Sequence, residues 1–297
     1  MISARLEIFQ RTPAQLGEGP CWHPRRESLW WIDIPGKTLF EADLHGGPVR
    51  KVALTQMAGS IAVASDGRFI SALHRGIHLI DPVTGSLERF TEIPDHDPIN
   101  FRFNDGKVDP QGRFWAGTLG LKGQRGQSRL FRIQGDRSVA VMLEHVSISN
   151  GLAWAPDERT LYYVDSPTRQ VQAFDFDGNQ GVIYGGRVAI SLTDHEGVPD
   201  GCCMDAEGCL WLAHWGGAKL TRWNPRTAEL LQTISLPVRN VTCCAFGGPK
   251  LDKLFVTTAV DPEADRPEPE AGFVFCLEPG VSGLVQSPFR LPYGDHP

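Results

Sequence analysis

The chain has 297 residues, of which 41% are hydrophobic and 22% are charged, and its formal net charge is −6. This mixture is typical of a globular protein, and the scattered Lys and Arg residues argue against a nucleic-acid-binding surface. No apolar run approaches the roughly 20 residues that span a bilayer, and residues 1–13 lack the apolar segment of a signal peptide. We therefore expect a cytoplasmic protein with no nucleic-acid or membrane partner.

The cysteines favour the same compartment. Their number is odd, two pairs are adjacent in sequence, and no C-x-x-C pair occurs, so neither a disulfide framework nor a zinc ribbon is indicated. We expect buried, reduced thiols on strands. The positions are Cys21, Cys202, Cys203, Cys209, Cys243, Cys244 and Cys276.

A weak internal repeat organises the chain. Each copy has an apolar residue, a turn with Pro, Asp or Gly, and a strand rich in aromatic residues and leucine; a third strand follows, and often a fourth. Four short strands per repeat of about 45 residues predict an all-β fold, a six-bladed β-propeller with four antiparallel strands per blade. Helical periodicity is almost absent, which argues against βαβ folds. The copies are anchored at intervals of 41 to 50 residues on Trp22, Val63, Val108, Trp154, Met204 and Phe246.

The two ends of the chain are expected to meet. The last repeat lacks a fourth strand, because residues 281–297 resemble a loop-rich tail. Residues 4–10 alternate well enough to replace it by pairing near Phe273–Leu277, which would leave no sheet edge unpaired. We thus expect one propeller domain over residues 1–297, closed by the N-terminal strand.

Polar residues recur at one position of the repeat, four residues before each anchor. Since the first strand of each copy is expected to line the central channel, these residues should share one level of it. Taken singly, pairs such as Asn-Gly and Asp-Gly are typical of tight turns. Their recurrence in four copies favours a shared site, built on a tight backbone that aims the side chains inward. The six positions are Glu18, Gly59, Asn104, Asn150, Asp200 and Thr242.

Two carboxylates and two amides suit a hard divalent cation, which prefers oxygen ligands. No His or Cys occupies the six positions, which argues against a structural zinc site. Without a cation, Glu18 and Asp200 would be like charges converging on one channel. The sequence therefore predicts a metal-binding channel.

Other candidate chemistry has less support. His195, in the segment leading to Asp200, could form a catalytic dyad with it, although a histidine in a rim loop is the commoner outcome. The chain has no G-x-S-x-G motif and no phosphate-binding loop with Lys and Ser/Thr. The aromatic residues of the second strands are expected to pack between blades, and residues 260–272 to form a surface loop.

Four segments resemble the regucalcin/gluconolactonase family. They are "LGEGPCWHP", "RFNDGKVDPQGRFWAGT", "ISNGLAW" with "LYYVDS", and "VPDGCCMDAEGCLWLAHWGG", and the likeness extends from about Leu16 to Gly272. The resemblance implies a six-bladed propeller with one divalent metal in its channel and, in most members, hydrolysis of sugar lactones.

The resemblance also implies roles for individual residues. The metal ligands would be Glu18, Asn150 and Asp200, with Asp200 also the general base, and the substrate contacts would include Arg102 and Asn104. Vertebrate members have an acidic stretch after "AGT", whereas this chain has "LGLKGQRGQ", with Lys122 near the position of a substrate-contacting carboxylate. This segment is more similar to bacterial sugar lactonases.

We therefore predict metal-dependent hydrolysis of an aldonolactone, such as glucono-, xylono-, arabino- or galactonolactone. The metal would polarise the carbonyl or activate water, Asp200 would accept the proton, and Arg102 and Asn104 would hold the substrate. Calcium, magnesium, manganese, zinc and iron all remain candidate ions. Two alternatives stay open: a non-catalytic calcium-binding propeller, and a metal-dependent esterase or phosphotriesterase. If Asp200 is only a ligand, His195 is the next candidate base.

Overall fold

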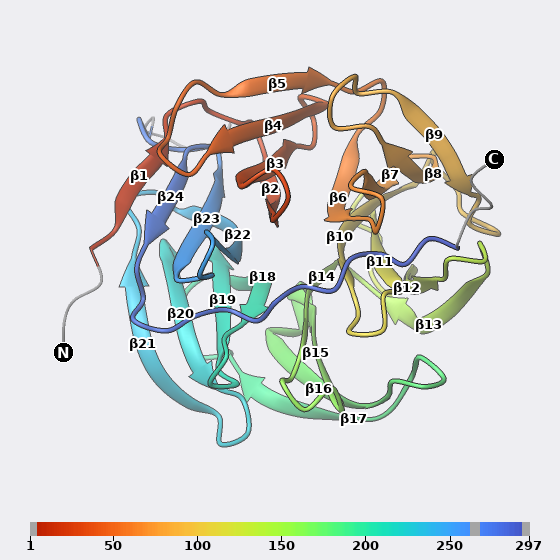
Figure 1. Cartoon of the computed structure of the whole chain (residues 1–297). Helices are drawn as coiled ribbons and strands as arrows, with labels where there is room; N and C mark the ends of the chain where they lie inside the picture. Colours follow the sequence, from red (N-terminus) through yellow and green to blue (C-terminus); the bar gives the residue numbers. More distant parts are fainter. Residues whose placement is uncertain (1–4, 262–267, 293–297) are drawn as a thin grey trace.

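Six four-stranded antiparallel sheets surround a central channel in the computed structural model, which describes residues 5–261 and 268–292 (Figure 1). The predicted six-bladed β-propeller is confirmed. Within the described part of the chain the helical content is one 3-10 turn, η1 (Ser166–Thr168), and no helix is long and apolar enough to cross a membrane. The strands are β1 (Glu7–Gln10), β2 (Gly17–His23), β3 (Ser28–Asp33), β4 (Thr38–Asp43), β5 (Arg50–Ala53), β6 (Ala58–Val63), β7 (Phe69–Leu73), β8 (Gly76–Ile80), β9 (Leu87–Thr91), β10 (Phe101–Val108), β11 (Phe114–Gly120), β12 (Ser128–Ile133), β13 (Val139–Val146), β14 (Ser149–Trp154), β15 (Thr160–Asp165), β16 (Gln170–Asp177), β17 (Val182–Ser191), β18 (Val198–Met204), β19 (Leu210–Trp215), β20 (Lys219–Asn224), β21 (Glu229–Ser235), β22 (Asn240–Gly247), β23 (Lys253–Ala259) and β24 (Val274–Leu277).

Each of the first five blades is built from four consecutive strands, with the first innermost and the last at the rim. Blades one to five thus run β2–β5, β6–β9, β10–β13, β14–β17 and β18–β21, and the sixth has the order β22, β23, β24, β1. Figure 1 shows β2, β6, β10, β14, β18 and β22 around the axis. The first strand of every repeat therefore faces the channel, as predicted.

The apolar core lies between the blades. In the described residues it divides into six clusters, one at each interface between neighbouring blades, including the interface of the sixth with the first. Alternating side chains of a sheet point to opposite faces, so each blade contributes to two clusters. The aromatic residues of the second strands pack here as predicted, each at most 4% exposed: Trp30, Trp31, Tyr162, Tyr163 and Trp211.

The N-terminal strand closes the ring. Strand β1 pairs antiparallel with β24, with Glu7 opposite Cys276 and Ile8 opposite Phe275. The ring of Phe9 contacts that of Phe255 edge-on, with centroids 4.8 Å apart. Pairing of the N-terminal segment with the third strand of the last blade is thus confirmed, although the strand itself begins at Glu7 and Ala4 lies outside the described residues.

The inner strands carry a register irregularity at the level predicted for the shared site. The pairing of β2, β10, β14 and β18 with their neighbours skips residues after Glu18 and around Asn104, Asn150 and Asp200, and β6 and β22 show the same feature. These are β-bulges, which re-aim side chains locally. At residues 104–106 the tight backbone expected for the shared site is a bulge within the continuous strand β10 and not a turn.

The glycines that follow the polar channel positions mostly serve to make room for a neighbouring strand, and only one of them adopts a backbone conformation that favours glycine. Only Gly19 has a positive φ, of 54°, whereas Gly106, Gly151 and Gly201 do not. A Cβ on Gly151 would come within 2.7 Å of the carbonyl oxygen of Asp200, and one on Gly201 within 2.3 Å of the Cys243 sulfur. Glycine at these positions lets neighbouring inner strands approach closely.

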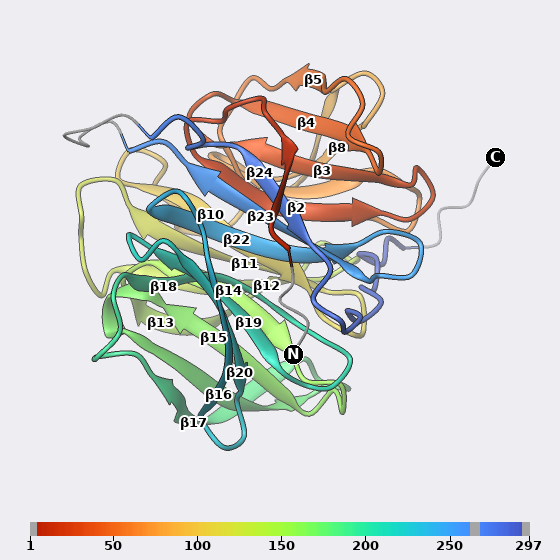
Figure 2. The ribbon, with the colours of Figure 1, turned by 90° about the vertical axis from the view of Figure 1, so that its left-hand side faces the viewer.

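The C-terminal segment is more structured than the sequence indicated. Residues 281–292 cross one end of the channel, in front of the inner strands in Figure 1 and along the right-hand side in Figure 2. Backbone hydrogen bonds join Ser282 to Ala206 of blade five, Gly283 to Leu251 of blade six, and Phe289 to blade two. The Phe289 side chain is fully buried in the cluster between blades two and three.

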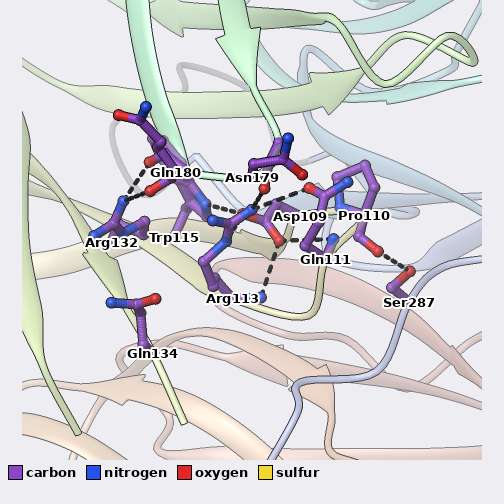
Figure 3. A network of polar contacts seen from close by, with 12 residues as sticks. Asp109, Pro110, Gln111, Arg113, Trp115, Arg132, Gln134, Asn179, Gln180 and Ser287 are labelled. Carbon is purple, nitrogen blue, oxygen red and sulfur yellow. Dashed lines mark hydrogen bonds and ion pairs between the residues drawn. The ribbon is translucent and has the colours of Figure 1, made fainter. Parts of the chain in front are cut away.

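A polar network anchors this segment to blade three (Figure 3). Buried Asp109, in the turn between β10 and β11, accepts hydrogen bonds from Arg113 Nε at 2.7 Å and Trp115 Nε1 at 2.9 Å. Ser287 Oγ donates to the carbonyl oxygen of Pro110 in the same turn, at 2.9 Å. A buried carboxylate with several charge-assisted partners makes a rigid support.

Ring closure generates a stability prediction. Deleting residues 1–10 removes the β1–β24 ladder and leaves the β24 edge and Phe255 exposed, so the melting temperature should fall by several degrees or more. Deleting only residues 1–4 is the control and should have little effect. An unchanged melting temperature for the longer deletion, measured by circular dichroism, would show that β1 does not stabilise the ring.

Candidate metal and substrate site

Two aspartates fix the chain where it enters the inner strands of blades one and four. Asp33, at the end of β3, accepts hydrogen bonds from two backbone N–H groups just before β2, at 2.9 and 3.2 Å. Asp165, at the end of β15, does the same for the two residues before β14, at 3.0 and 2.9 Å. These contacts hold the backbone immediately before Glu18 and Asn150, so both side chains start from a fixed position.

The Glu18 and Asp200 carboxylates face the channel from blades one and five. Both residues are buried, at 3% and 5% exposure. Glu18 Oε2 accepts a hydrogen bond from the N–H of Gly19 at 3.1 Å, and Asp200 is hydrogen-bonded by the N–H of Gly201. Neither carboxylate forms an ion pair with any described residue. Most of their lone pairs are therefore available to a ligand in the channel.

Burial and the proximity of other carboxylates raise the pKa values of Glu18 and Asp200. Burial raises the pKa of Glu18 well above its ordinary value, and the charges of Asp105 and Asp200 raise it further. Burial also raises the pKa of Asp200 well above the usual range, with a further contribution from Asp105 that the Arg102 guanidinium partly offsets. The arrangement destabilises the ionised carboxylates unless another positive charge joins them.

The side-chain amides of Asn104 and Asn150, two of the six channel positions, contact each other directly. Asn104 Nδ2 donates to Asn150 Oδ1 at 2.6 Å and to the carbonyl oxygen of Ser149 at 2.8 Å. Asn150 Nδ2 donates to Ser166 Oγ at 2.7 Å, and Ser166 Oγ donates to the carbonyl oxygen of Pro199 at 2.6 Å. This chain of hydrogen bonds links blades three, four and five and orients Asn150 Oδ1 toward the ring.

Ser166 was not identified from the sequence, although it lies in the quoted segment "LYYVDS". Its position after the second strand gave no indication that its hydroxyl contacts two inner strands. The hydroxyl bridges Asn150 to the strand that carries Asp200. Ser166 therefore sets the distance between two of the predicted metal ligands.

The other two of the six positions, Thr242 and Gly59, make contacts that join neighbouring blades. Thr242 Oγ1 donates to the carbonyl oxygen of Gly17 at 2.5 Å, which joins blade six to blade one. A Cβ on Gly59 would lie 2.5 Å from the backbone of Phe103, so the absence of a side chain lets β6 reach β10. Contacts between neighbouring members thus join the inner strands, and four of the six positions carry a carboxylate or amide side chain.

Arg102 lies beside this ring with part of its guanidinium free. Its Nη1 donates to Asn104 Oδ1 at 2.8 Å and to the carbonyl oxygen of Phe103 at 2.9 Å. Nε and Nη2 have no hydrogen-bond partner among the described residues. Burial lowers the pKa of Arg102, while the charges of Glu18, Asp105 and Asp200 raise it, so the group stays protonated. The free N–H groups can bind an oxygen of a substrate.

Asn104 differs in detail from its predicted role. Both hydrogens of its amide nitrogen are donated to protein oxygens, and Oδ1 accepts one hydrogen bond from Arg102. What remains is one lone pair on Oδ1, which can accept a hydrogen bond from a hydroxyl but cannot stabilise an oxyanion. Asn104 thereby orients Arg102 and Asn150.

Asp105 is a third carboxylate of the channel, which sequence reasoning missed. It is buried, and burial raises its pKa to about 6, although the charges of Lys107 and Arg102 lower it. Its influence on the pKa values of Glu18 and Asp200 places it close to both. Its position next to Asn104 was the available signal, because a bulge can turn two consecutive side chains toward one side.

Lys122 lies at the same end of the channel as Arg102. It follows β11, whose Leu119 pairs with Arg102, and its Nζ is 3.2 Å from Asn100 Oδ1. The side chain is exposed at the rim. It does not reach the carboxylate ring, so contact with a substrate would involve atoms projecting from the mouth.

His195 packs away from the ring. Its imidazole contacts the rings of Trp223 and His214, with centroid separations of 5.3 and 6.4 Å. No hydrogen bond joins it to Asp200 among the described residues. The two residues do not form a dyad in this structure.

The donor set fits a divalent cation. Two buried carboxylates and an amide oxygen from three blades face one space, and among the described residues neither carboxylate has an ion-pair partner, although the Arg102 charge partly offsets their repulsion. Oxygen-only sets of this kind are typical of calcium, magnesium and manganese. No group of three or more His, Cys, Asp and Glu side chains with metal-binding geometry occurs in the described residues, so a site that needs only those side chains is not indicated.

The family comparison agrees with this geometry. The model of the SMP-30/Gluconolactonase/LRE-like region matches residues 16–260. The chain belongs to this family. It is 35% identical to regucalcin of Xenopus laevis, over 97% of this chain and 99% of the relative. It is 33% identical to a Bacillus subtilis protein named as a candidate sugar lactone lactonase, over 94% of this chain and 96% of the relative.

Among solved structures of the family, the chain is similar to a calcium-binding protein, regucalcin, from Agrobacterium tumefaciens. The TM-score is 0.91 with 31% sequence identity, and the alignment covers 97% of this chain and 98% of the other. The family assignment predicted from the four sequence segments is therefore confirmed.

The Glu18→Gln substitution tests the metal site with two opposite expected effects. Metal affinity, measured by titration calorimetry with Ca²⁺ after chelator treatment, should fall more than about tenfold because one of two ligand charges is lost. The metal-free protein should melt at a higher temperature than the wild type, since the substitution removes a buried like charge. Glu27→Gln, at an exposed carboxylate, is the control. Unchanged affinity would exclude Glu18 as a ligand.

Proposed function

We propose that this protein hydrolyses an aldonolactone, with glucono-, xylono-, arabino- and galactonolactone as the candidate substrates, and that it requires one divalent metal ion. The observation that carries the proposal is the convergence of the unpaired Glu18 and Asp200 carboxylates with Asn150, beside a guanidinium that has free N–H groups. Membership of a family that includes proteins named as lactonases supports the same reaction.

Glu18, Asn150 and Asp200 would hold the ion. A divalent cation bound there supplies positive charge that polarises the lactone carbonyl and makes a nearby water more acidic. The remaining work falls to the side chains of this chain. Asp200 would accept the proton of the attacking water through the oxygen that it keeps free. The new bond joins the water oxygen to the carbonyl carbon, the ring C–O bond breaks, and the released hydroxyl takes up a proton.

Substrate positioning would fall to Arg102, Asn104 and Lys122. The free N–H groups of Arg102 would donate to an oxygen of the lactone, with the strength of a charge-assisted hydrogen bond. Asn104 would hold Arg102 in place and accept a hydrogen bond from one sugar hydroxyl. Lys122, at the rim, would contact the polar tail of the sugar. A sugar lactone is then the small-molecule partner, and a cytoplasmic location remains a prediction.

A screen of these four lactones with a pH indicator, in the presence and absence of a chelator, tests the proposal. We expect acid release that the chelator abolishes and added metal restores.

One specific observation favours a second candidate, a non-catalytic calcium-binding protein, because the similar Agrobacterium structure is described as calcium-binding. Calcium binding without hydrolysis of any lactone or simple ester would favour that candidate.

The Asp200→Asn substitution separates the two roles of this residue. The amide keeps one potential oxygen ligand, so metal affinity should fall only about tenfold to a hundredfold. Turnover at saturating metal should fall by roughly 10² to 10⁴, the usual contribution of a positioned general base. Near-normal kcat at saturating metal would mean that Asp200 is a ligand only and that another group accepts the proton.

A further inference from the structure

The end of the channel opposite Arg102 contains a cavity of about 440 Å³. Its walls come from the inner strands beyond the carboxylate ring, and residues Leu284–Pro288 of the C-terminal segment lie over it. A smaller cavity of about 140 Å³ shares Lys107, Met204 and Leu284–Ser287 with it. Cavities of this size are typical of small-molecule sites. We call the larger cavity the rear chamber; the lactone reaction proposed above does not use it.

Lys107 lines the rear chamber, together with Asp105 on the side of the other carboxylates. Its side chain leaves β10 in blade three, and Nζ donates to the carbonyl oxygen of Cys202 in blade five at 2.7 Å. The side chain therefore crosses the channel past the inner strand of blade four. Among the described residues no carboxylate lies within ion-pair distance of Nζ and no second acceptor binds it, so two of its N–H groups have no protein partner.

A second polar group in the chamber also lacks a partner. Ser60 is 1% exposed, its Oγ has no hydrogen-bond partner in the described part of the protein, and it lines the same cavity. A buried donor without an acceptor costs free energy that a bound oxygen would recover. Lys107 and Ser60 thus both favour a ligand that carries hydrogen-bond acceptors.

The rest of the lining is mainly apolar. The Cys21 thiol is uncharged, because burial raises its pKa to about 12. Asp105 borders the cavity on the side of Glu18, which disfavours an anion deeper in the channel, and Arg25 and Glu27 are exposed and opposite in charge. The apolar lining includes Val63, Leu152, Met204, Cys243, Phe246 and Leu284.

We propose that the rear chamber binds an amphipathic monocarboxylate, a molecule with one carboxylate and a compact or short-chain hydrocarbon body. The carboxylate would accept hydrogen bonds from the free N–H groups of Lys107, and the Ser60 hydroxyl supplies another donor on the wall. The hydrocarbon body would occupy the space between the inner strands and the C-terminal segment. The site is independent of lactone hydrolysis.

Titration calorimetry of the metal-loaded protein with octanoate tests the proposal. We expect saturable binding of one molecule per chain. Affinity should rise about fourfold per methylene along butanoate, hexanoate and octanoate, because each buried methylene adds a constant free energy. Octanol, which lacks the charge, should bind at least about tenfold more weakly. Equal affinity for octanoate and octanol, or no dependence on chain length, would overturn the proposal.

Substitutions locate the site. Lys107→Met should weaken octanoate binding about tenfold to a hundredfold by removing a charge-assisted hydrogen bond. Arg102→Met, at the other end of β10, and Lys250→Met, exposed outside the chamber, should leave the octanoate affinity unchanged. Binding that survives Lys107→Met, or is lost in Arg102→Met, would place octanoate elsewhere and overturn the proposal.

A second variant keeps the test decisive if Lys107→Met does not fold. Ala62→Phe retains Lys107 and adds a large side chain to the chamber wall. It should abolish octanoate binding by filling the space. Unchanged octanoate affinity in a folded Ala62→Phe protein would contradict the assignment of the chamber.

Discussion

The pairing of β1 with β24 is the constraint on which the rest of the structure depends. It joins the first and last strands of the chain, so that the blades form a ring with an apolar cluster at every interface. The same closure brings blade six against blade one, where Thr242 donates to the carbonyl oxygen of Gly17. Glu18 follows directly after this contact. Closure of the ring therefore places Glu18 at the level of Asp200, and a site shared by distant parts of the chain becomes possible.

Charge in the channel follows from that geometry. Glu18, Asp105 and Asp200 bring three carboxylates together, and two cations of β10, Arg102 and Lys107, lie on either side of them. The formal sum of these five groups is −1, and one divalent cation would change it to +1. Burial of like charges without a partner is unfavourable, so the raised pKa values and the preference for a cation have the same physical origin. A net positive channel would in turn attract oxygen-rich or anionic ligands.

Much of the fold and site could be predicted from the sequence because the blades repeat in register. One bulge at the same place in every inner strand keeps Glu18, Asn104, Asn150 and Asp200 at equivalent positions. The repeat count assigned only one residue of each inner strand to the channel. It could not identify Asp105, because the bulge in β10 turns two consecutive side chains, Asn104 and Asp105, toward the channel. The composition Asn-Asp-Gly does not distinguish a turn from a bulge, so the sequence predicted a tight backbone at residues 104–106 but not that it would be a bulge within β10. The docking of residues 281–292 could not be predicted from the sequence, because this segment pairs through isolated bridges and not through a strand. Its buried aromatic residue, Phe289, is not part of a periodic apolar pattern.

The path of the C-terminal segment has a mechanical consequence. In a propeller each blade touches only its two neighbours, so the ring can become elliptical through small displacements at each interface. Residues 281–292 act as a chord: they bind blades five and six at one end and blades two and three at the other, which are opposite pairs across the axis. A chord resists changes in diameter that neighbour contacts resist poorly. Glu18 on blade one and Asp200 on blade five are separated by blade six, so the shape of the ring sets the distance between their carboxylates and the size of ion that they can share.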